Sequence, residues 1–139
     1  MDKYLDEALC EKYPKIFAQR HGDPAKTAMC WGFACGDGWY NILDNLCGAI
    51  QDYCDNVKQY RDGKLVPVCE QVVATQVKEK FGELRFYYDG GNDVVHGMVA
   101  MAEYMASHTC EQCGKPGKLR TIRGWVTTAC DEHYQYKVQ

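Results

Sequence analysis

The 139-residue sequence lacks any long hydrophobic run. No stretch reaches the roughly 18 consecutive apolar residues that a membrane-spanning helix requires. The first residues, Met1-Asp2-Lys3-Tyr4, also lack the basic and then apolar regions of a secretory signal peptide. Proteins of the reducing cytosol rarely contain disulfides. We therefore expect a cytoplasmic protein with no membrane segment, whose nine cysteines are metal ligands and buried thiols.

Motifs of the common enzyme classes are also missing. The chain contains no Gly-x-Ser-x-Gly elbow, no Walker phosphate loop, no His-Glu-x-x-His motif and no dinucleotide fingerprint. Three residues offer acid–base chemistry nevertheless. His96 and Glu103 share one face of a predicted helix because they lie seven positions apart, and Asp37 is a further carboxylate. A hydrolase or nuclease that uses these residues is the least favoured hypothesis, and the sequence favours a protein that is not an enzyme.

Net positive charge is absent as well. The chain has 16 Lys and Arg residues against 19 Asp and Glu residues, and a net charge of −3 argues against non-specific coating of nucleic acid. Residues 31–57 contain four aspartates and no Lys or Arg, which is typical of the solvated face of a helix. Basic side chains gather near the C-terminus, at Lys115, Lys118, Arg120 and Arg123. These either face phosphates or line ordinary solvated strand edges.

The most specific pattern is formed by two short cysteine motifs. Cys110 and Cys113 form a Cys-x2-Cys pair, and Cys130 and His133 form a Cys-x2-His pair after an insert of sixteen residues. This is the ligand spacing of a tetrahedral Cys3His zinc site. Gly114 follows the first pair, where a positive φ lets backbone amides face the sulfurs. Because protein fills all four ligand positions, we expect a structural Zn2+ and no deaminase-like chemistry, which needs an open position for water.

Hydrophobic spacing predicts helices in the first half of the chain. A first helix begins near Asp2, and Pro14 is expected to end it and to open a short second helix through Phe17. A longer helix is predicted from Asp37, which acts as its N-cap, to Val57, followed by a turn at 61–64. Its apolar stripe comprises Trp39, Ile42, Leu43, Leu46, Ile50, Tyr53 and Val57.

Two strand-like runs follow, at 71–80 and 84–88, and Phe81-Gly82-Glu83 forms the loop of a hairpin between them. Strand alternation places four side chains on one face, namely Lys78, Lys80, Arg85 and Tyr87. Such a face can hold phosphates while the tyrosine stacks on a base. The alternative is a solvated sheet face whose charges pair with Glu79 or Glu83.

The second half contains one more helix and a hairpin between the cysteine motifs. A turn is predicted at 89–92, and Asp93 is predicted to cap a helix that runs to about Ser107. Its expected buried stripe consists of Val94, Val95, Met98, Met101, Ala102 and Met105. Strands are predicted near 119–122 and 125–128, with Trp125 packed behind the metal site.

Two further motifs each allow a second interpretation. The segment Cys35-Gly36-Asp37-Gly38-Trp39 places two glycines at a helix N-terminus, where backbone amides can bind an anion. Since Asp37 would repel a phosphate, capping is favoured, although Asp37 and Trp39 stay candidate ligand-binding residues. Cys30 and Cys35, with His21 or Cys10, offer a second metal site, but their spacing favours buried thiols. The same expectation covers the other cysteines outside the zinc motifs, Cys47, Cys54 and Cys69.

These elements predict an α+β fold in which a small antiparallel sheet packs on two or three helices and a zinc-ribbon-like lobe follows. The body is expected to span residues 1–107 and the lobe residues 108–139, and the two are expected to pack together as one compact unit.

Three long strings in the sequence carry a resemblance. They are Cys35-Gly-Asp-Gly-Trp-Tyr40, Gln76-Val-Lys-Glu-Lys-Phe-Gly-Glu-Leu-Arg-Phe-Tyr87, and the region from Cys110-Glu-Gln-Cys-Gly-Lys-Pro-Gly117 to Cys130-Asp-Glu-His133. Residues from about 10 to 133 resemble a family of small proteins of bacteriophage and prophage genomes. The resemblance implies action in the cytoplasm of a bacterial host, by binding a host factor. Inhibition of a defence system, through a protein or a signalling nucleotide, is the favoured role. A nucleic-acid-binding module that uses the basic hairpin is the alternative.

Overall fold

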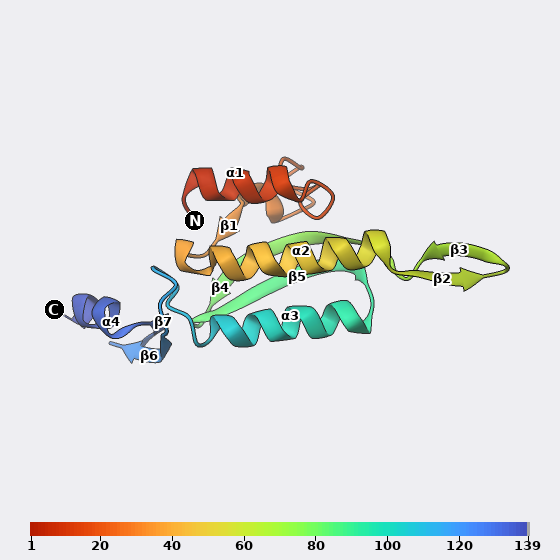
Figure 1. Cartoon of the computed structure of the whole chain (residues 1–139). Helices are drawn as coiled ribbons and strands as arrows, with labels where there is room; N and C mark the ends of the chain where they lie inside the picture. Colours follow the sequence, from red (N-terminus) through yellow and green to blue (C-terminus); the bar gives the residue numbers. More distant parts are fainter. Residues whose placement is uncertain (139) are drawn as a thin grey trace.

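A computed structural model describes the backbone of residues 1–138 and the side chains of residues 1–135. The chain forms a mixed α+β fold, as predicted (Figure 1). Its helices are α1 (Lys3–Lys12), α2 (Tyr40–Asn56), α3 (Asp93–Ala106) and α4 (Asp131–Val138), with short 3-10 turns η1 (Met29–Trp31) and η2 (Asp37–Trp39). Its strands are β1 (Phe33–Ala34), β2 (Lys58–Arg61), β3 (Lys64–Pro67), β4 (Glu70–Lys80), β5 (Glu83–Gly91), β6 (Lys118–Ile122) and β7 (Trp125–Ala129). No helix within residues 1–138 combines the length and the apolar character needed to cross a bilayer.

The β4–β5 hairpin forms the centre of the fold. Its strands pair antiparallel, and β1 pairs in parallel with β4 through Phe33 opposite Val77, so the three-stranded sheet is mixed. Phe81 and Gly82 both adopt positive φ in the turn, which suits the twist of a tight hairpin. Residues 89–91, predicted as a turn, continue β5 instead. Helices α2 and α3 lie side by side and antiparallel over one face of this sheet (Figure 1).

Helix α2 carries the predicted apolar stripe. Trp39, Leu43, Leu46 and Ile50 are buried, whereas Val57 at the end of the stripe is 41% exposed. The prediction that Asp37 caps this helix is wrong. The 3-10 turn η2 leads into α2 without a side-chain cap, and the Asp37 carboxylate accepts the backbone N–H of Asp2 at 2.6 Å.

Helix α3 differs from its prediction at the cap and on the buried face. Asn92, not Asp93, accepts the first free amides, those of Val94 and Val95. The buried residues are Val95, Val99, Ala102 and Ala106. Of the predicted stripe, Val94, Met101 and Met105 are exposed by 49%, 60% and 51%. Apolar residues occupy two adjacent stripes of this helix, and the sheet covers the one that contains the smaller side chains.

The N-terminal segment packs beside α2 and β1. Asp2 caps α1, but residues after Pro14 form turns, so the predicted short second helix is absent between Pro14 and Arg20. Asp6 is buried and accepts hydrogen bonds from Arg20 Nε at 2.9 Å and from the Phe33 amide at 3.1 Å. This charged pair ties α1 to the segment that leads into β1.

A second hairpin, formed by β2 and β3, projects beyond the end of the sheet (Figure 1). The sequence predicted only its turn, at 61–64. Tyr60 lies opposite Leu65 in this hairpin, and their side chains are 76% and 60% exposed. We refer to residues 58–67 as the arm.

Acid sensitivity is expected from a bond between α1 and α2. The Tyr13 hydroxyl donates to Asp44 Oδ1 at 2.5 Å, and Lys12 Nζ lies 2.9 Å from the same atom. Tyr13 and Lys12 lower the pKa of the Asp44 carboxyl. A lowered folded-state pKa stabilises the fold above the unfolded value of about 3.9, and this stability is lost as pH falls through the folded-state pKa. Asp44→Asn should therefore cost about 1–2 kcal/mol at neutral pH and less at pH near 3, which lies below the unfolded-state pKa.

Urea unfolding of both proteins at the two pH values measures this difference. Asp52→Asn is the matched control, because Asp52 is exposed on the same helix and its partner Asn56 is exposed as well. An Asp44→Asn penalty that is equally large at both pH values would contradict the assignment.

Candidate metal centre

Two tight turns bring the four predicted ligands together. Cys110 and Cys113 lie in the turn between α3 and β6, where the Gly114 amide donates to Cys110 O at 2.9 Å. Gly114 adopts φ +79°, as its position in the motif predicted. Cys130 follows β7, and His133 lies in the first turn of α4, which the sequence did not predict. The hairpin β6–β7 between the turns confirms the predicted strands.

The distances fit one tetrahedral ion. All four ligand atoms lie within 4.8 Å of one another. Cys113 Sγ and Cys130 Sγ are 3.8 Å apart, and His133 Nδ1 lies 3.5 Å from Cys110 Sγ and 3.3 Å from Cys130 Sγ. A zinc ion with Zn–S bonds of about 2.3 Å requires S···S edges of about 3.8 Å and S···N edges of about 3.5 Å. The site therefore has the dimensions of a closed Cys3His centre.

Electrostatics favour the thiolate form of one ligand, Cys110. Burial alone would raise the pKa of Cys110, which is fully buried, but backbone N–H groups of Cys130, Cys113 and Gln112 lower it to about 6. Soft thiolates with one imidazole form a donor set that suits a structural zinc ion. These four residues are the one group of three or more potential metal ligands among residues 1–138.

The segment Gly36–Trp39 docks the metal centre onto the body. The Gly38 amide donates to Glu111 O at 2.7 Å, and Trp39 Nε1 donates to Thr109 O at 2.9 Å. A Cβ atom at Gly38 would lie only 2.1 Å from Cys110 O. The two glycines of this motif therefore permit close backbone contact with a cysteine turn, which the sequence analysis did not anticipate.

On the other side, the lobe contacts the β4–β5 turn. Thr128 is almost fully buried, and its hydroxyl donates to Gly82 O at 2.7 Å. The prediction that Trp125 packs behind the metal site is wrong, because its side chain is 77% exposed at the tip of the β6–β7 hairpin. Hydrogen bonds of Thr109, Glu111 and Thr128 thus connect this segment to the rest of the chain. The last residue of the predicted range 108–139 lies outside the described part.

The four side chains of the predicted basic sheet face lie together in the structure, but one of them is paired with an acidic residue. Lys78 pairs with Arg85 in register and Tyr87 lies opposite Gln76, which places Lys78, Lys80, Arg85 and Tyr87 on one face. Arg85 forms an ion pair with Glu83 at 2.6 Å. Tyr87 is 43% exposed. Trp39, the other aromatic ligand candidate, is fully buried and offers no surface to a ligand.

The acid–base candidates do not gather into one site through any described contact. Glu103 accepts the backbone N–H of Phe86 at 3.1 Å, and Asp37 accepts that of Asp2. His96 is exposed on α3. Both carboxylates therefore satisfy backbone donors.

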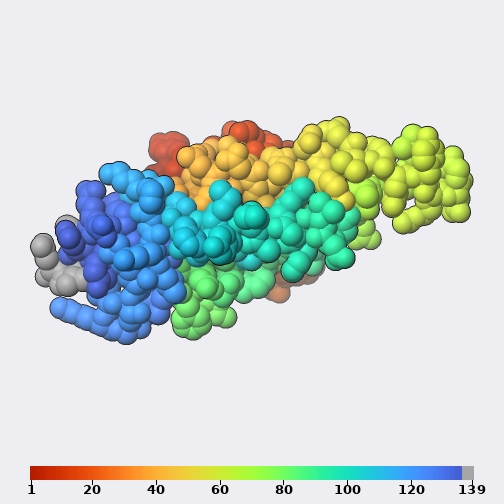
Figure 2. All heavy atoms as spheres, turned by 60° about the horizontal axis from the view of Figure 1, so that its bottom comes forward, coloured from red at the N-terminus to blue at the C-terminus, as the bar shows by residue number. Residues whose placement is uncertain are grey.

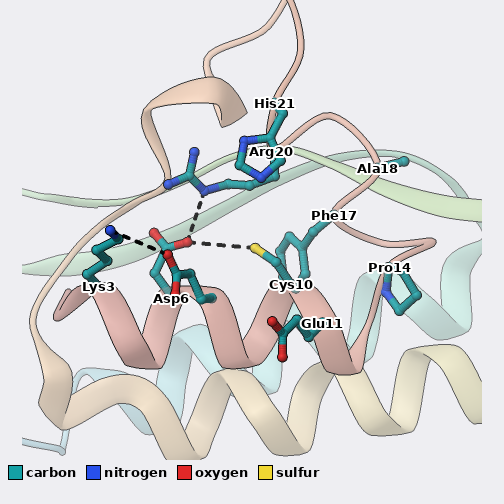
Figure 3. A pocket seen from close by; sticks show the side chains of 10 residues that line it. Lys3, Asp6, Cys10, Glu11, Pro14, Phe17, Ala18, Arg20 and His21 are labelled. Carbon is teal, nitrogen blue, oxygen red and sulfur yellow. Dashed lines mark hydrogen bonds and ion pairs between the residues drawn. The ribbon is translucent and has the colours of Figure 1, made fainter.

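The cysteines outside the motifs are thiols without a metal-binding arrangement. Cys35, Cys47 and Cys54 are buried, whereas Cys10, Cys30 and Cys69 are half-buried. Burial raises the pKa of Cys35 to about 12, and burial together with Asp6 raises that of Cys10 to about 12. Protonated thiols are poor metal ligands. Cys10 and His21 instead line a cavity of about 860 Å3 beside α1, where Asp6 bonds to Arg20 and Cys10 (Figure 3).

An apolar groove between α2 and α3 was missed by the sequence analysis. It encloses about 590 Å3 and is lined by Asn41, Ile42, Asn45, Leu46, Ala49, Gly97, Met98, Met101, Ala102 and Met105. The two helices run next to each other along one side of the molecule, between the metal lobe and the arm (Figure 2). The sequence did carry a signal for this groove. Helix α3 contains more apolar residues than a single buried face can accommodate.

Comparisons with protein-family models, with curated proteins and with solved structures found no significant match to this chain.

Proposed function

We propose that this chain is a zinc-stabilised binding protein that holds a basic amphipathic helix of a partner protein in the groove between α2 and α3. The observation that carries the proposal is the exposure of Met101 and Met105, by 60% and 51%, in a groove with few polar groups. Methionine side chains adapt their shape and are frequent on surfaces that bind amphipathic helices. The resemblance to phage proteins supports a host protein as the partner.

The charge of the groove walls selects the partner. Helices α2 and α3 contain no lysine or arginine. Of their five acidic residues, Asp44 and Asp55 form ion pairs with Lys12 and Lys15, and Glu103 accepts the Phe86 amide. Asp52 and Asp93 form no such ion pair with the side chains described for residues 1–135. Asp52 and Asp93 are exposed at the same end of the groove, where Asn92 Nδ2 donates to Tyr53 OH at 2.9 Å across the two helices. A helix with one apolar face and flanking Lys or Arg side chains complements this surface.

The metal centre has a supporting role in this proposal. Trp39 precedes α2 and Thr109 follows α3, and the bond between them joins the ends of both groove walls. Thr109 is adjacent to the ligand Cys110, so a bound zinc ion fixes this end of the groove. A closed site of four protein ligands offers no position for substrate, which is consistent with binding and not catalysis.

The alternative of nucleic-acid binding has weaker support from the charges. Lys115 lies 3.6 Å from Glu132, and Arg120 is bonded to Asp131 and stacks on Tyr134. Half of the four basic residues of the hairpin are therefore paired with acidic ones. A shallow dependence of affinity on salt would argue against this alternative.

Binding of designed peptides tests the groove. We expect an 18-residue Leu/Lys amphipathic helix to bind, and the matching Leu/Glu helix to bind at least tenfold more weakly. Met101→Lys should weaken binding of the Leu/Lys peptide by at least tenfold, because it places a like charge in the apolar centre. Fluorescence anisotropy of labelled peptides measures both effects.

Tyr104→Lys is the matched control. Tyr104 lies on the same helix and is 66% exposed, but its ring packs against His108 and it does not line the groove. The affinity of the Tyr104→Lys variant for the Leu/Lys peptide should stay within about twofold of that of the unmodified protein. Equal losses in the two variants, or equal binding of both peptides, would refute the groove as the binding site.

A further inference from the structure

Two thiols meet at the base of the arm, far from the metal ligands in the sequence. Cys54 Sγ and Cys69 Sγ are 3.8 Å apart. Cys54 lies in the last turn of α2, and Cys69 lies between β3 and β4. A disulfide requires an S–S bond of about 2.05 Å, so the two sulfur atoms need to approach by about 1.8 Å.

We propose that Cys54 and Cys69 are a site of reversible oxidation, at which a small-molecule disulfide of the glutathione type converts the two thiols into an intramolecular disulfide that closes the base of the arm. This inference is independent of the groove and of its partner. It assigns a modification site to two cysteines that are not among the four candidate metal ligands.

The surroundings give one of the two thiols access to a reagent. Cys54 is only 6% exposed, whereas Cys69 is half-buried. Both line a cavity of about 240 Å3 with Lys15, Asp55, Lys58, Pro67 and Gln71. Cys69 is therefore the thiol that a reagent reaches first, and Cys54 is placed to act second.

The reaction balances in two exchanges. The Cys69 thiolate attacks one sulfur of the reagent RSSR, which forms a mixed disulfide and releases one RS−. The Cys54 thiolate then attacks the Cys69 sulfur and releases the second RS−. In total, two protein thiols are oxidised to one disulfide, and RSSR is reduced to two RSH.

Burial, together with the neighbouring Cys54, raises the pKa of Cys69 to about 11. The charged groups that face this pair are Lys15, Asp55 and Lys58, and Lys15 is itself paired with Asp55 at 3.2 Å. The thiolate fraction is consequently small at neutral pH, so the exchange is slow and accelerates about tenfold for each pH unit in the alkaline direction.

Closure would change the arm. The new bond encloses residues 55–68, which include both strands β2 and β3. In the reduced state the base of the arm is joined by the bond from the Val68 amide to Val57 O at 3.2 Å. An isolated two-stranded hairpin is marginally stable in water, so a covalent link at its base restricts it strongly.

Trypsin provides a direct assay on the intact, zinc-loaded protein. The arm contains Lys58, Arg61 and Lys64, all exposed and all between the two cysteines. After incubation with oxidised glutathione at mildly alkaline pH and brief digestion, the arm is cut. We expect the two fragments to run as one band on a non-reducing denaturing gel and to separate after reduction. Zinc content is measured before and after, so that oxidation of the metal ligands is recognised.

Variants identify the linked residues. Cys54→Ser should abolish the single band and leave glutathione attached to Cys69. Cys30→Ser is the matched control, because Cys30 is a half-buried cysteine on the same tryptic peptide as Cys54, and it should leave the link intact. Separation of the fragments of the unmodified protein without reduction, or glutathione retained on its Cys69, would overturn the proposal.

Discussion

Removal of the metal is expected to unfold the C-terminal lobe. Among the side chains described for the lobe, up to residue 135, the buried hydrophobic cluster consists of Cys110, Ala129 and Cys130, with Tyr134 packed against it. Its strands β6 and β7 form a two-stranded sheet, which has little stability by itself. Binding of zinc by such a site supplies on the order of 10 kcal/mol to folding. Without the ion, neighbouring thiolates repel each other and the lobe has too small a core to stay ordered.

Elemental analysis and hydrogen exchange measure this effect. We expect one zinc ion per chain, and we expect a chelator or the change Cys130→Ser to remove it and to expose the amides of β7 to exchange. Cys30→Ser should change neither result, since Cys30 lies outside the cluster. Purified protein without zinc, or a lobe that keeps its slow exchange after the metal is lost, would contradict the assignment.

Substitution of Gly38 by alanine is expected to separate the lobe from the body. The new methyl group would lie 2.1 Å from Cys110 O and 2.6 Å from the Gly114 amide nitrogen. Both are backbone atoms of a tight turn that a bound metal would hold in place, so they cannot move aside as a side chain would. The bonds from Gly38 to Glu111 and from Trp39 to Thr109 would break. We expect a loss of about 3 kcal/mol or more in the free energy of unfolding.

Gly97→Ala is the control, because this substitution is expected to stabilise the protein. Gly97 lies within α3, and a Cβ atom there would have no neighbour within 4 Å. Alanine favours a helix over glycine by about 0.5–1 kcal/mol, so this variant should be more stable. Thermal unfolding of both variants with zinc present separates the two effects. Equal stability of Gly38→Ala and the unmodified protein would show that the lobe does not depend on this contact.

Local patterns in the sequence predicted the elements that depend on local interactions. The Cys3His cluster followed from the spacing of its residues, the β4–β5 hairpin from its alternation, and α2 from its apolar stripe. The N-cap of α3 could not be assigned from residue type, because Asn92 and Asp93 are adjacent and both residue types suit an N-cap. Only the exact start of the helix distinguishes them.

Contacts between distant segments could not be read from local patterns. The Gly36–Trp39 segment has the composition of an anion-binding turn, and only the fold shows that its close neighbour is the Cys110–Gly114 backbone. The outer stripe of α3 is as apolar as the inner one, so hydrophobicity alone could not show which stripe the sheet covers. The arm was missed because its strands bury little apolar surface, which leaves weak alternation in the sequence.

The bond between Trp39 and Thr109 joins residues that lie seventy positions apart in the chain. During synthesis, α2 and the central hairpin leave the ribosome before the second pair of cysteine and histidine ligands exists. Capture of zinc is therefore expected to be the last folding event, since all four ligands come together only when the chain is nearly finished. A chain that stops before residue 130 would keep its apolar groove but would lack the ion that fixes one end of it. Such truncated chains would expose the groove methionines while one end of α2 and α3 is not held in place. We expect cellular proteases to degrade these chains rapidly.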